Sequence, residues 1–193
     1  MNWLDRTELL LGKEKLEKLE QANVLVVGLG GVGAYAAEQL CRAGIGKMTI
    51  VDGDVVEESN RNRQLPALIS NTGLSKAEIL AERFRDINPS LKLTVINDYI
   101  AGEKTLELLK REKYDYVVDA IDTLSPKVFL IYHATQLGLR VVSSMGAGGK
   151  IDPGEVRTSD ISKSFNCNLA RTIRKRLSKL GIKKGIKVVF SSE

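Results

Sequence analysis

Four glycines at close spacing mark the first segment of the chain that is suited to chemistry. They are Gly28, Gly30, Gly31 and Gly33, directly after an apolar run at residues 23–28. Glycines in this pattern let a backbone turn tightly and come close to a phosphate, and a helix that starts behind them offers unpaired N–H groups to the anion. Asp52, at the end of the next apolar run, falls where a ribose-binding carboxylate belongs. These residues predict a nucleotide site, without choosing between NAD and ATP.

The charged segment after Asp52 favours a triphosphate over a nicotinamide. Asn60, Arg63 and Gln64 lie in the run SNRNRQ at residues 59–64, and Lys76 follows near the start of the next predicted helix. A nicotinamide ring needs an apolar slot, whereas guanidinium and ammonium groups suit a triphosphate whose pyrophosphate must be stabilised as it leaves. A solvated polar loop that caps a helix is the alternative interpretation.

Two carboxylates stand at the end of the strand predicted at residues 116–120. Asp119 belongs to the apolar run and is expected to bond to the backbone, whereas Asp122 is the first polar residue beyond the run. A carboxylate at that place suits Mg²⁺, which binds oxygen ligands and usually keeps substrate phosphates in its shell. Capping of the helix predicted at residues 125–137 is the alternative role of Asp122.

Histidine and cysteine are too scarce to build other common sites. His133 is the only histidine and lies in an apolar run, so we interpret it as a packed helix residue rather than a metal ligand. Cys41 and Cys167 form no CxxC pair, which excludes a four-ligand zinc site. Cys167 is interpreted as a structural thiol, because Lys163 is its one neighbour in sequence able to activate it.

Strand and helix patterns alternate from residue 23 onward. Strands are predicted at residues 23–28, 48–52, 91–96, 116–120 and 141–145, and helices at 31–43, 74–87, 104–112 and 125–137. Such alternation is typical of parallel βαβ units, and it predicts an α/β fold with a Rossmann-like, doubly wound, mainly parallel sheet. Because ligands bind beyond the carboxyl ends of such strands, the glycines, the segment after Asp52 and Asp122 are expected to line the binding crevice.

A small basic extension follows a glycine-rich hinge at residues 146–149. An irregular strand is predicted at 151–160, a helix at 166–180 and a strand at 187–190, and the helix carries Leu169, Ile173, Leu177 and Leu180 on one face. Residues 157–193 hold ten Lys and Arg against two acids, a net charge of +8 that leaves −3 for the remainder of a chain whose net charge is +5. The extension is expected to meet an anionic partner.

Length and composition bound the class of protein. The 193 residues are 43% hydrophobic and 27% charged, which suits one packed core and excludes disordered, collagen-like and disulfide-scaffold chains. No apolar run approaches the ~20 residues that a membrane span needs, so we expect a soluble, cytoplasmic protein. Three parts are expected: an N-terminal arm or helix at 1–22, an ATP-binding domain at 23–150 and a basic part of the same domain at 151–193.

The glycine loop, the SNRNRQ run, Lys76 and the segment DAID at residues 119–122 together resemble the ThiF/MoeB/HesA superfamily, the relatives of ubiquitin-activating enzymes. This resemblance runs from about residue 6 to residue 149 and implies adenylation of a carboxylate with ATP and Mg²⁺. The opening RTELLLG at residues 6–12, SMGAGGKIDP at 144–153 and the closing VFSSE at 189–193 are similar to the branch of tRNA threonylcarbamoyladenosine dehydratases. That branch implies a tRNA substrate, and its members continue beyond the closing segment, so a truncated or shorter form is expected.

The resemblance implies a role for each candidate residue. The four glycines would line the phosphates and Asp52 would hold the ribose. The triphosphate would be contacted by Asn60, Arg63, Gln64 and Lys76, and Mg²⁺ would be held by Asp122. Arg6 matches an arginine that reaches the site of the partner subunit, so a homodimer is implied and Arg6 joins Arg63, Lys76 and Asp122 as a catalytic candidate.

Other functions stay open at this point. Adenylation of the C-terminus of a ubiquitin-like or sulfur-carrier protein, as in MoeB or ThiF, would need such a partner and a reactive Cys167. A non-catalytic nucleotide-binding scaffold would bind ATP without converting it. A dehydrogenase is disfavoured by Arg61, Arg63 and Lys76. Sulfur-transfer proteins are further partners that the superfamily implies.

Overall fold

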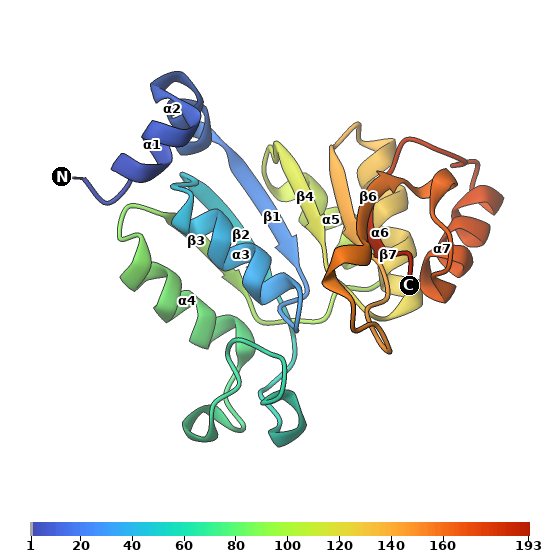
Figure 1. The fold of residues 1–193 in the computed structure, drawn as a ribbon, viewed down its shortest axis with the longest axis horizontal. Coiled ribbons are helices and arrows are strands. Elements are labelled where there is room, and N and C mark those ends of the chain that lie inside the picture. The colour runs from blue at the N-terminus through green and yellow to red at the C-terminus, as the bar shows by residue number, and fades with distance from the viewer. Residues whose placement is uncertain (1) are drawn as a thin grey trace. The chain divides into compact units, whose positions relative to one another are not determined.

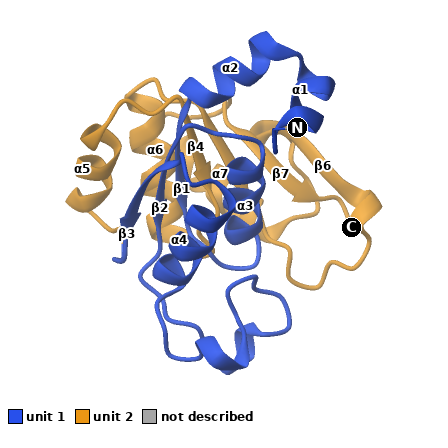
Figure 2. Cartoon of the chain, turned by 90° about the vertical axis from the view of Figure 1, so that its left-hand side faces the viewer, with its two compact units in different colours: residues 1–99 blue, residues 100–193 orange. Residues whose placement is uncertain are grey.

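The computed structural model describes residues 2–193, and the chain divides into two compact units, residues 1–99 and 100–193 (Figures 1 and 2). No helix among the described residues is long and apolar enough to cross a membrane. The functional parts predicted from the sequence, with boundaries at residues 22 and 150, are not tested by this division and stay a prediction.

The first unit is built on three parallel strands. They are β1 (Asn23–Val27), β2 (Lys47–Val51) and β3 (Lys92–Ile96), in the spatial order β3-β2-β1. The register pairs Val24 with Met48, and Met48 in turn with Leu93. Every residue of β1 is buried, as expected for a parallel strand that is covered on both faces.

Helices α3 (Gly33–Arg42) and α4 (Lys76–Ile87) pack on these strands through small and apolar side chains. Figure 1 shows both helices over the same face of the strands. Helix α4 starts where Ser75 accepts the N–H of Glu78, and it ends at Ile87 with Asn88 as its C-cap, because the following Pro89 cannot continue it. The predicted start at residue 74 is therefore wrong by two residues, and Leu74 stays exposed.

Helices α1 (Asp5–Leu11) and α2 (Lys13–Gln21) lie where an N-terminal arm or helix is expected, and α2 packs on the turn before β2. The backbone N–H of Gly46 donates to Leu19 O, and a Cβ on Gly46 would lie 1.6 Å from the backbone oxygen of Glu20. This close approach explains why a glycine stands at position 46.

A carboxylate between α3 and α4 ties the two helices together. Glu38 is 6% exposed, accepts Arg42 Nε at 2.8 Å and Arg83 Nε at 2.6 Å, and so bonds to both helices. The hydrogen bond from Arg83 is the main reason that the pKa of Glu38 lies below its ordinary value, although burial opposes it.

Replacement Glu38→Gln should cost about 1 kcal/mol of unfolding free energy at neutral pH, because both arginines are half exposed and water screens the pair. Since the folded pKa is lowered, this contribution is present above the ordinary pKa of Glu38 and is lost as the pH falls through the lowered pKa. Urea unfolding of wild type, Glu38→Gln and the exposed control Glu82→Gln at neutral pH and about pH 3 measures it. A difference that is as large in acid as at neutral pH would contradict the account.

The second unit has four strands. They are β4 (Tyr116–Asp119), β5 (Val141–Ser144), β6 (Val156–Asp160) and β7 (Lys187–Ser191), in the order β4-β5-β7-β6. Strands β4, β5 and β7 are parallel, and β6 pairs antiparallel with β7. Helices α5 (Glu103–Arg111), α6 (Leu124–Gln136) and α7 (Asn168–Lys179) complete the unit, with α6 in contact with both of the others.

Two predictions for the end of the chain need correction. The strand predicted at 151–160 begins only at Val156, because Pro153 lacks an N–H and residues Pro153–Glu155 form a 3₁₀ turn that the side chain of Asp152 caps. The apolar face of α7 buries Ala170, Ile173 and Leu177, whereas Leu180 lies past the last helical residue and is 40% exposed.

Candidate functional site

The glycine loop of the first unit leaves β1 and enters α3 as predicted. Gly28 has a φ of +88° and donates its N–H to Val51 O, so the loop turns back against the end of β2. A Cβ on Gly30 would lie 3.8 Å from Gln64 Nε2, and one on Gly31 would lie 3.6 Å from the Cγ of Arg63. The fold thus brings the glycine loop and the SNRNRQ run together, although they are more than 25 residues apart in sequence.

Asp52 fixes the loop through its carboxylate. Oδ2 accepts the N–H of Leu29 at 2.6 Å, and Oδ1 accepts the N–H of Asp54 at 2.8 Å. Burial raises the pKa of Asp52, while these two N–H donors and the charge of Lys76 act against the rise. An ionised carboxylate has about four acceptor positions, so two remain for hydroxyl groups of a ribose.

Lys76 is held by Asp54, which in turn bonds to Tyr99, and sequence reasoning missed both of these residues. Its ammonium is 2.9 Å from Asp54 Oδ2, and the Lys76 side chain is only 6% exposed. Asp54 also accepts the Tyr99 hydroxyl at 2.6 Å. Burial of Asp54 opposes its ionisation, but the hydrogen bonds from Tyr99 and Lys76 outweigh this and lower its pKa. The position of Lys76 in the first turn of a helix expected to pack on the sheet could have indicated such a partner, because a buried lysine needs a carboxylate.

The SNRNRQ run contains one paired and one unpaired arginine. Arg61 forms an ion pair with Glu58. Arg63 is exposed, and among residues 2–193 it donates only to Ser59 O at 3.0 Å and Asn62 Oδ1 at 2.9 Å, both uncharged acceptors. The charge of Arg63 is therefore available to an anion.

Asn60 and Gln64 differ in how far the fold already satisfies them. Asn60 Oδ1 accepts the N–H of Glu57 in a capping box at the 3₁₀ helix η1 (Glu58–Asn60). For Asn60, the structure therefore agrees with the alternative interpretation of this run as a polar loop that caps a helix. Gln64 Oε1 is buried and has no hydrogen-bond partner in the part of the chain that the structure describes. An unpaired buried acceptor beside a glycine loop is a place where a ligand donor would be stabilised.

In the second unit, Asp119 forms a fully buried ion pair. Its Oδ2 is 2.9 Å from Lys127 Nζ and accepts the Ser143 hydroxyl at 2.5 Å, and neither Asp119 nor Lys127 is exposed. Asp119 also accepts the N–H of Ile121, which confirms the expected backbone bond, while Lys127 donates to Ile121 O at 2.8 Å. Burial raises the pKa of Asp119 against the opposing charge of Lys127. Lys127 was missed because it stands within an apolar helix.

Asp122 follows this pair and is exposed. The N-cap position of α6 is Thr123, whose side chain makes no capping hydrogen bond, so the alternative role of Asp122 as the helix cap is wrong. Within residues 2–193 the Asp122 carboxylate has no side-chain hydrogen bond or ion pair, and no group of three or more His, Cys, Asp or Glu side chains is placed to hold a metal. A single carboxylate suits a magnesium ion whose other ligands are phosphates and water.

The structure gives no sign of a catalytic environment around three further candidates among the described residues, Cys167, His133 and Arg6. Cys167 is buried at the start of α7, where its Sγ accepts the N–H of Ala170 at 3.4 Å, which favours the structural interpretation. His133 packs against the rings of Phe129 and Tyr132 in α6, as expected of a packed helix residue. Arg6 is exposed on α1.

Replacement Lys127→Met should cost about 3–5 kcal/mol of unfolding free energy, because it leaves Asp119 as an unpaired buried charge. The double variant Lys127→Met/Asp119→Asn removes both charges and should recover most of that loss. Urea unfolding of the three proteins measures both differences. If the double variant is as unstable as the single one, the ion pair is not what holds this part of the unit.

The model of the ThiF family matches residues 4–190, which is nearly the whole chain. The chain belongs to the ThiF family. This confirms the resemblance drawn from the motifs and extends it past residue 149 into the basic extension.

Relatives of this ThiF-family chain include the tRNA threonylcarbamoyladenosine dehydratase of Bacillus subtilis, 41% identical over 193 residues, which are 100% of this chain and 76% of the relative. The crystal structure of the E. coli dehydratase in complex with ATP is similar with a TM-score of 0.93 and 41% identity, and the match covers 97% of this chain and 80% of that one. The complex of the same enzyme with AMP matches with a TM-score of 0.93 and 41% identity, over 97% and 79% of the two chains. The predicted Rossmann-like, mainly parallel α/β fold is thereby confirmed.

Proposed function

We propose that the chain is an ATP-dependent tRNA threonylcarbamoyladenosine dehydratase, which adenylates the carboxylate of the modified nucleoside and then closes a ring with loss of water. The observation that carries the proposal is the 41% identity to the Bacillus subtilis dehydratase along the full length of this chain. A second support is the TM-score of 0.93 to the E. coli enzyme in complex with ATP.

The residues of the first unit fit ATP. Asp52 keeps two acceptor positions for a ribose, and Gly30 and Gly31 leave room beside Arg63 and Gln64 that side chains would fill. The roles carried by the resemblance follow: phosphate contact by the glycine loop, and triphosphate contact by Asn60, Arg63, Gln64 and Lys76. Asp54 limits the mobility of Lys76, so the ammonium is held in place before the substrate arrives.

Asp122 is the residue that would hold Mg²⁺, because its carboxylate is exposed and unengaged within the described residues. A divalent cation shared with phosphate oxygens would neutralise charge on the triphosphate and on the departing pyrophosphate. The bond-forming steps themselves involve only the residues of this chain, the modified nucleoside and ATP.

The reaction has two bond-forming steps. A carboxylate oxygen of the modified nucleoside attacks the α-phosphorus of ATP, and the bond to the pyrophosphate breaks, with Arg63 and Lys76 stabilising the leaving charge. An oxygen or nitrogen of the neighbouring carbamoyl group then attacks the acyl carbon, and AMP leaves with the former carboxylate oxygen. Proximity within one nucleoside supplies the effective concentration, so no protein nucleophile is needed. The buried, capping Cys167 agrees with this scheme.

A homodimer and a cytoplasmic location belong to the same proposal. Helix α1 carries Arg6 and leaves Leu9 and Leu10 about four-fifths exposed, with Trp3 half exposed just before it. An apolar surface of this kind is suited to a second copy, which would bring Arg6 to the partner's site in the manner of an arginine finger. Sulfur-transfer proteins as partners rest on the family resemblance alone.

Replacement of Arg63 or Asp122 by alanine should lower the rate of pyrophosphate release by roughly 10²–10³, the usual effect of removing one group that stabilises developing charge. Arg61→Ala is the matched control, because Arg61 already pairs with Glu58 and should change the rate little. Rates are measured with ATP, Mg²⁺ and tRNA that carries the threonylcarbamoyl group. Equal losses in the Arg61 and Arg63 variants would contradict the assigned role of Arg63.

The substrate is tested with three parallel reactions: modified tRNA, unmodified transcript and no RNA. We expect AMP and pyrophosphate only with modified tRNA, together with a nucleoside whose mass is lower by one water. Release of AMP that requires a ubiquitin-like protein instead would support the MoeB-like alternative. Binding of ATP without conversion under all conditions would support the scaffold alternative.

A further inference from the structure

The second unit carries a basic surface that the proposed ATP site does not use. Residues 161–192 contain nine Lys and Arg and no Asp or Glu. Helix α7 buries its apolar side chains, so its charged ones face outward. The exposed cations of α7 and of the segment behind it are Arg171, Lys175, Arg176, Lys179, Lys183 and Lys184.

Five of these six cations have no side-chain partner among the residues that the structure describes. Arg174 is not among them, because it is partly buried and donates to Ile161 O and to both oxygens of Ser164, so that it holds the loop before α7. Arg176 donates to the Ser125 hydroxyl at 3.0 Å. Across residues 2–193, no side-chain hydrogen bond or ion pair involves the other five exposed cations. The uncompensated charge favours an anionic partner.

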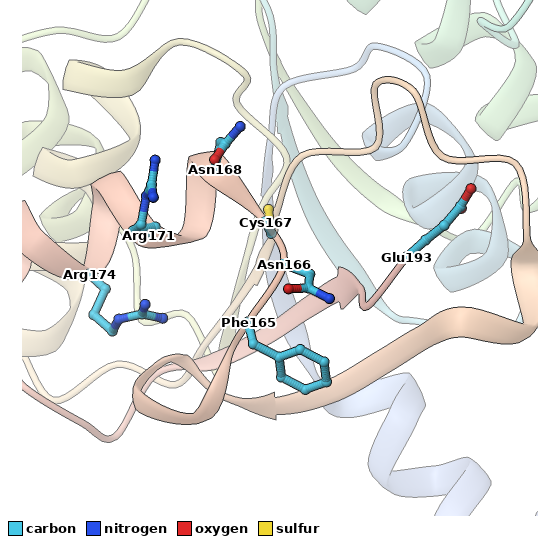
Figure 3. A pocket seen from close by; sticks show the side chains of 7 residues that line it. All are labelled: Phe165, Asn166, Cys167, Asn168, Arg171, Arg174 and Glu193. Atoms are coloured by element: carbon cyan, nitrogen blue, oxygen red, sulfur yellow. The ribbon is translucent and has the colours of Figure 1, made fainter.

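A pocket of about 430 Å³ opens beside this surface (Figure 3). Arg171 and Asn168 project from the first turns of α7, and the ring of Phe165 lies on the loop before the helix. Phe165 is 55% exposed although it packs edge-on against Phe190, with ring centroids 5.6 Å apart. The pocket therefore combines an open aromatic ring with an unpaired guanidinium.

The loop that presents Phe165 is held in an uncommon conformation. Asn166 has a φ of +49°, the one non-glycine residue among those described with a left-handed backbone, and its Nδ2 donates to Ser192 O at 3.0 Å. Glu193 is the one carboxylate at the pocket, and its Oε2 already accepts the N–H groups of Ile151 and Asp152. The loop is thus fixed, and the acid is engaged elsewhere.

We propose that this pocket and the outer face of α7 are the RNA-docking surface of the enzyme, with Phe165 stacking on an unpaired nucleobase and Arg171 holding a neighbouring phosphate. The inference rests on the proposed function, which requires the protein to hold a tRNA. Single-stranded RNA is recognised by aromatic stacking beside cations, whereas an acidic protein has no need of an exposed ring. Lys175, Lys179 and Lys183 extend the charge along the path of the backbone.

The test measures binding of an unmodified anticodon stem-loop RNA to the full chain without ATP, by fluorescence anisotropy over a range of salt concentrations. Phe165→Ala should weaken binding about 5- to 100-fold, the usual contribution of one stacked base. Arg171→Gln should weaken binding and reduce the slope of log K against log salt by about 0.7–0.9, as for the loss of one phosphate contact.

Matched controls lie on other helices of the same unit. Arg111→Gln removes an exposed arginine at the end of α5, and Phe129→Ala removes a 44% exposed ring from α6, so neither should change RNA binding. A blunt RNA duplex of equal length should be insensitive to Phe165→Ala and still sensitive to Arg171→Gln, because a duplex offers phosphates but no unpaired base.

Unchanged stem-loop affinity and salt slope in both variants would overturn the proposed surface, and so would equal losses in the variants and their controls. Circular dichroism and ATP binding of each variant show that it is folded. A wild-type protein that dehydrates modified tRNA while the two variants bind RNA normally would leave the proposed function standing and remove only this docking surface.

Discussion

The Asp52 carboxylate is the constraint on which the first unit's candidate site depends. It bonds to one N–H group within the glycine loop and to another in the segment after β2, so two loops far apart in sequence are fixed to one side chain. The glycine loop in turn lies against Arg63 and Gln64. Without that carboxylate both loops would lose their anchor, and the groups proposed to bind phosphate would no longer be held together before ATP arrives.

The second unit uses a carboxylate in a similar position for a different purpose. Asp119 also ends a parallel strand and also binds a backbone N–H, but it is fully buried and its remaining acceptors are taken by Lys127 and Ser143. Asp52 is only partly buried and keeps acceptor positions for a ligand. The number of free acceptors, rather than the residue type, distinguishes the carboxylate that we propose to bind ribose from the structural one. Asp122 is exposed and unengaged among the described residues, which supports its proposed role as a magnesium ligand.

Local pattern predicted most of the fold. The apolar runs and the glycine loop placed β1, β2, β4 and β5 to within a residue or so, because each is bounded by residues that end a strand or start a helix. The start of β6 was missed, since Pro153 and the Asp152 cap act on hydrogen bonds that hydrophobic pattern does not report. The exposure of Leu180 was missed for a similar reason, because the helix ends one residue before it.

Pairings between distant side chains were beyond reach of the sequence alone. Asp54 and Lys76 are 22 residues apart, and they meet because the segment after β2 forms a β-bridge, Val55 with Ser75, just before α4. Lys127 and Asp119 form their pair inside the apolar region, where each looked like an isolated exception. The candidate residues themselves were predicted from type and spacing, but which of them are already engaged, such as Asn60, and which are free, such as Arg63, required the structure.

The central claim is that the carboxylate of the modified nucleoside is activated by transfer of AMP. The most direct test labels that carboxylate with heavy oxygen, runs the reaction with ATP and full-length modified tRNA, and measures the isotope in each product by mass spectrometry. If the carboxylate attacks the α-phosphorus and AMP leaves from the acyl carbon, the released AMP carries one labelled oxygen and the pyrophosphate none. Labelled water with unlabelled AMP, or label in a phosphate product other than AMP, would contradict the account.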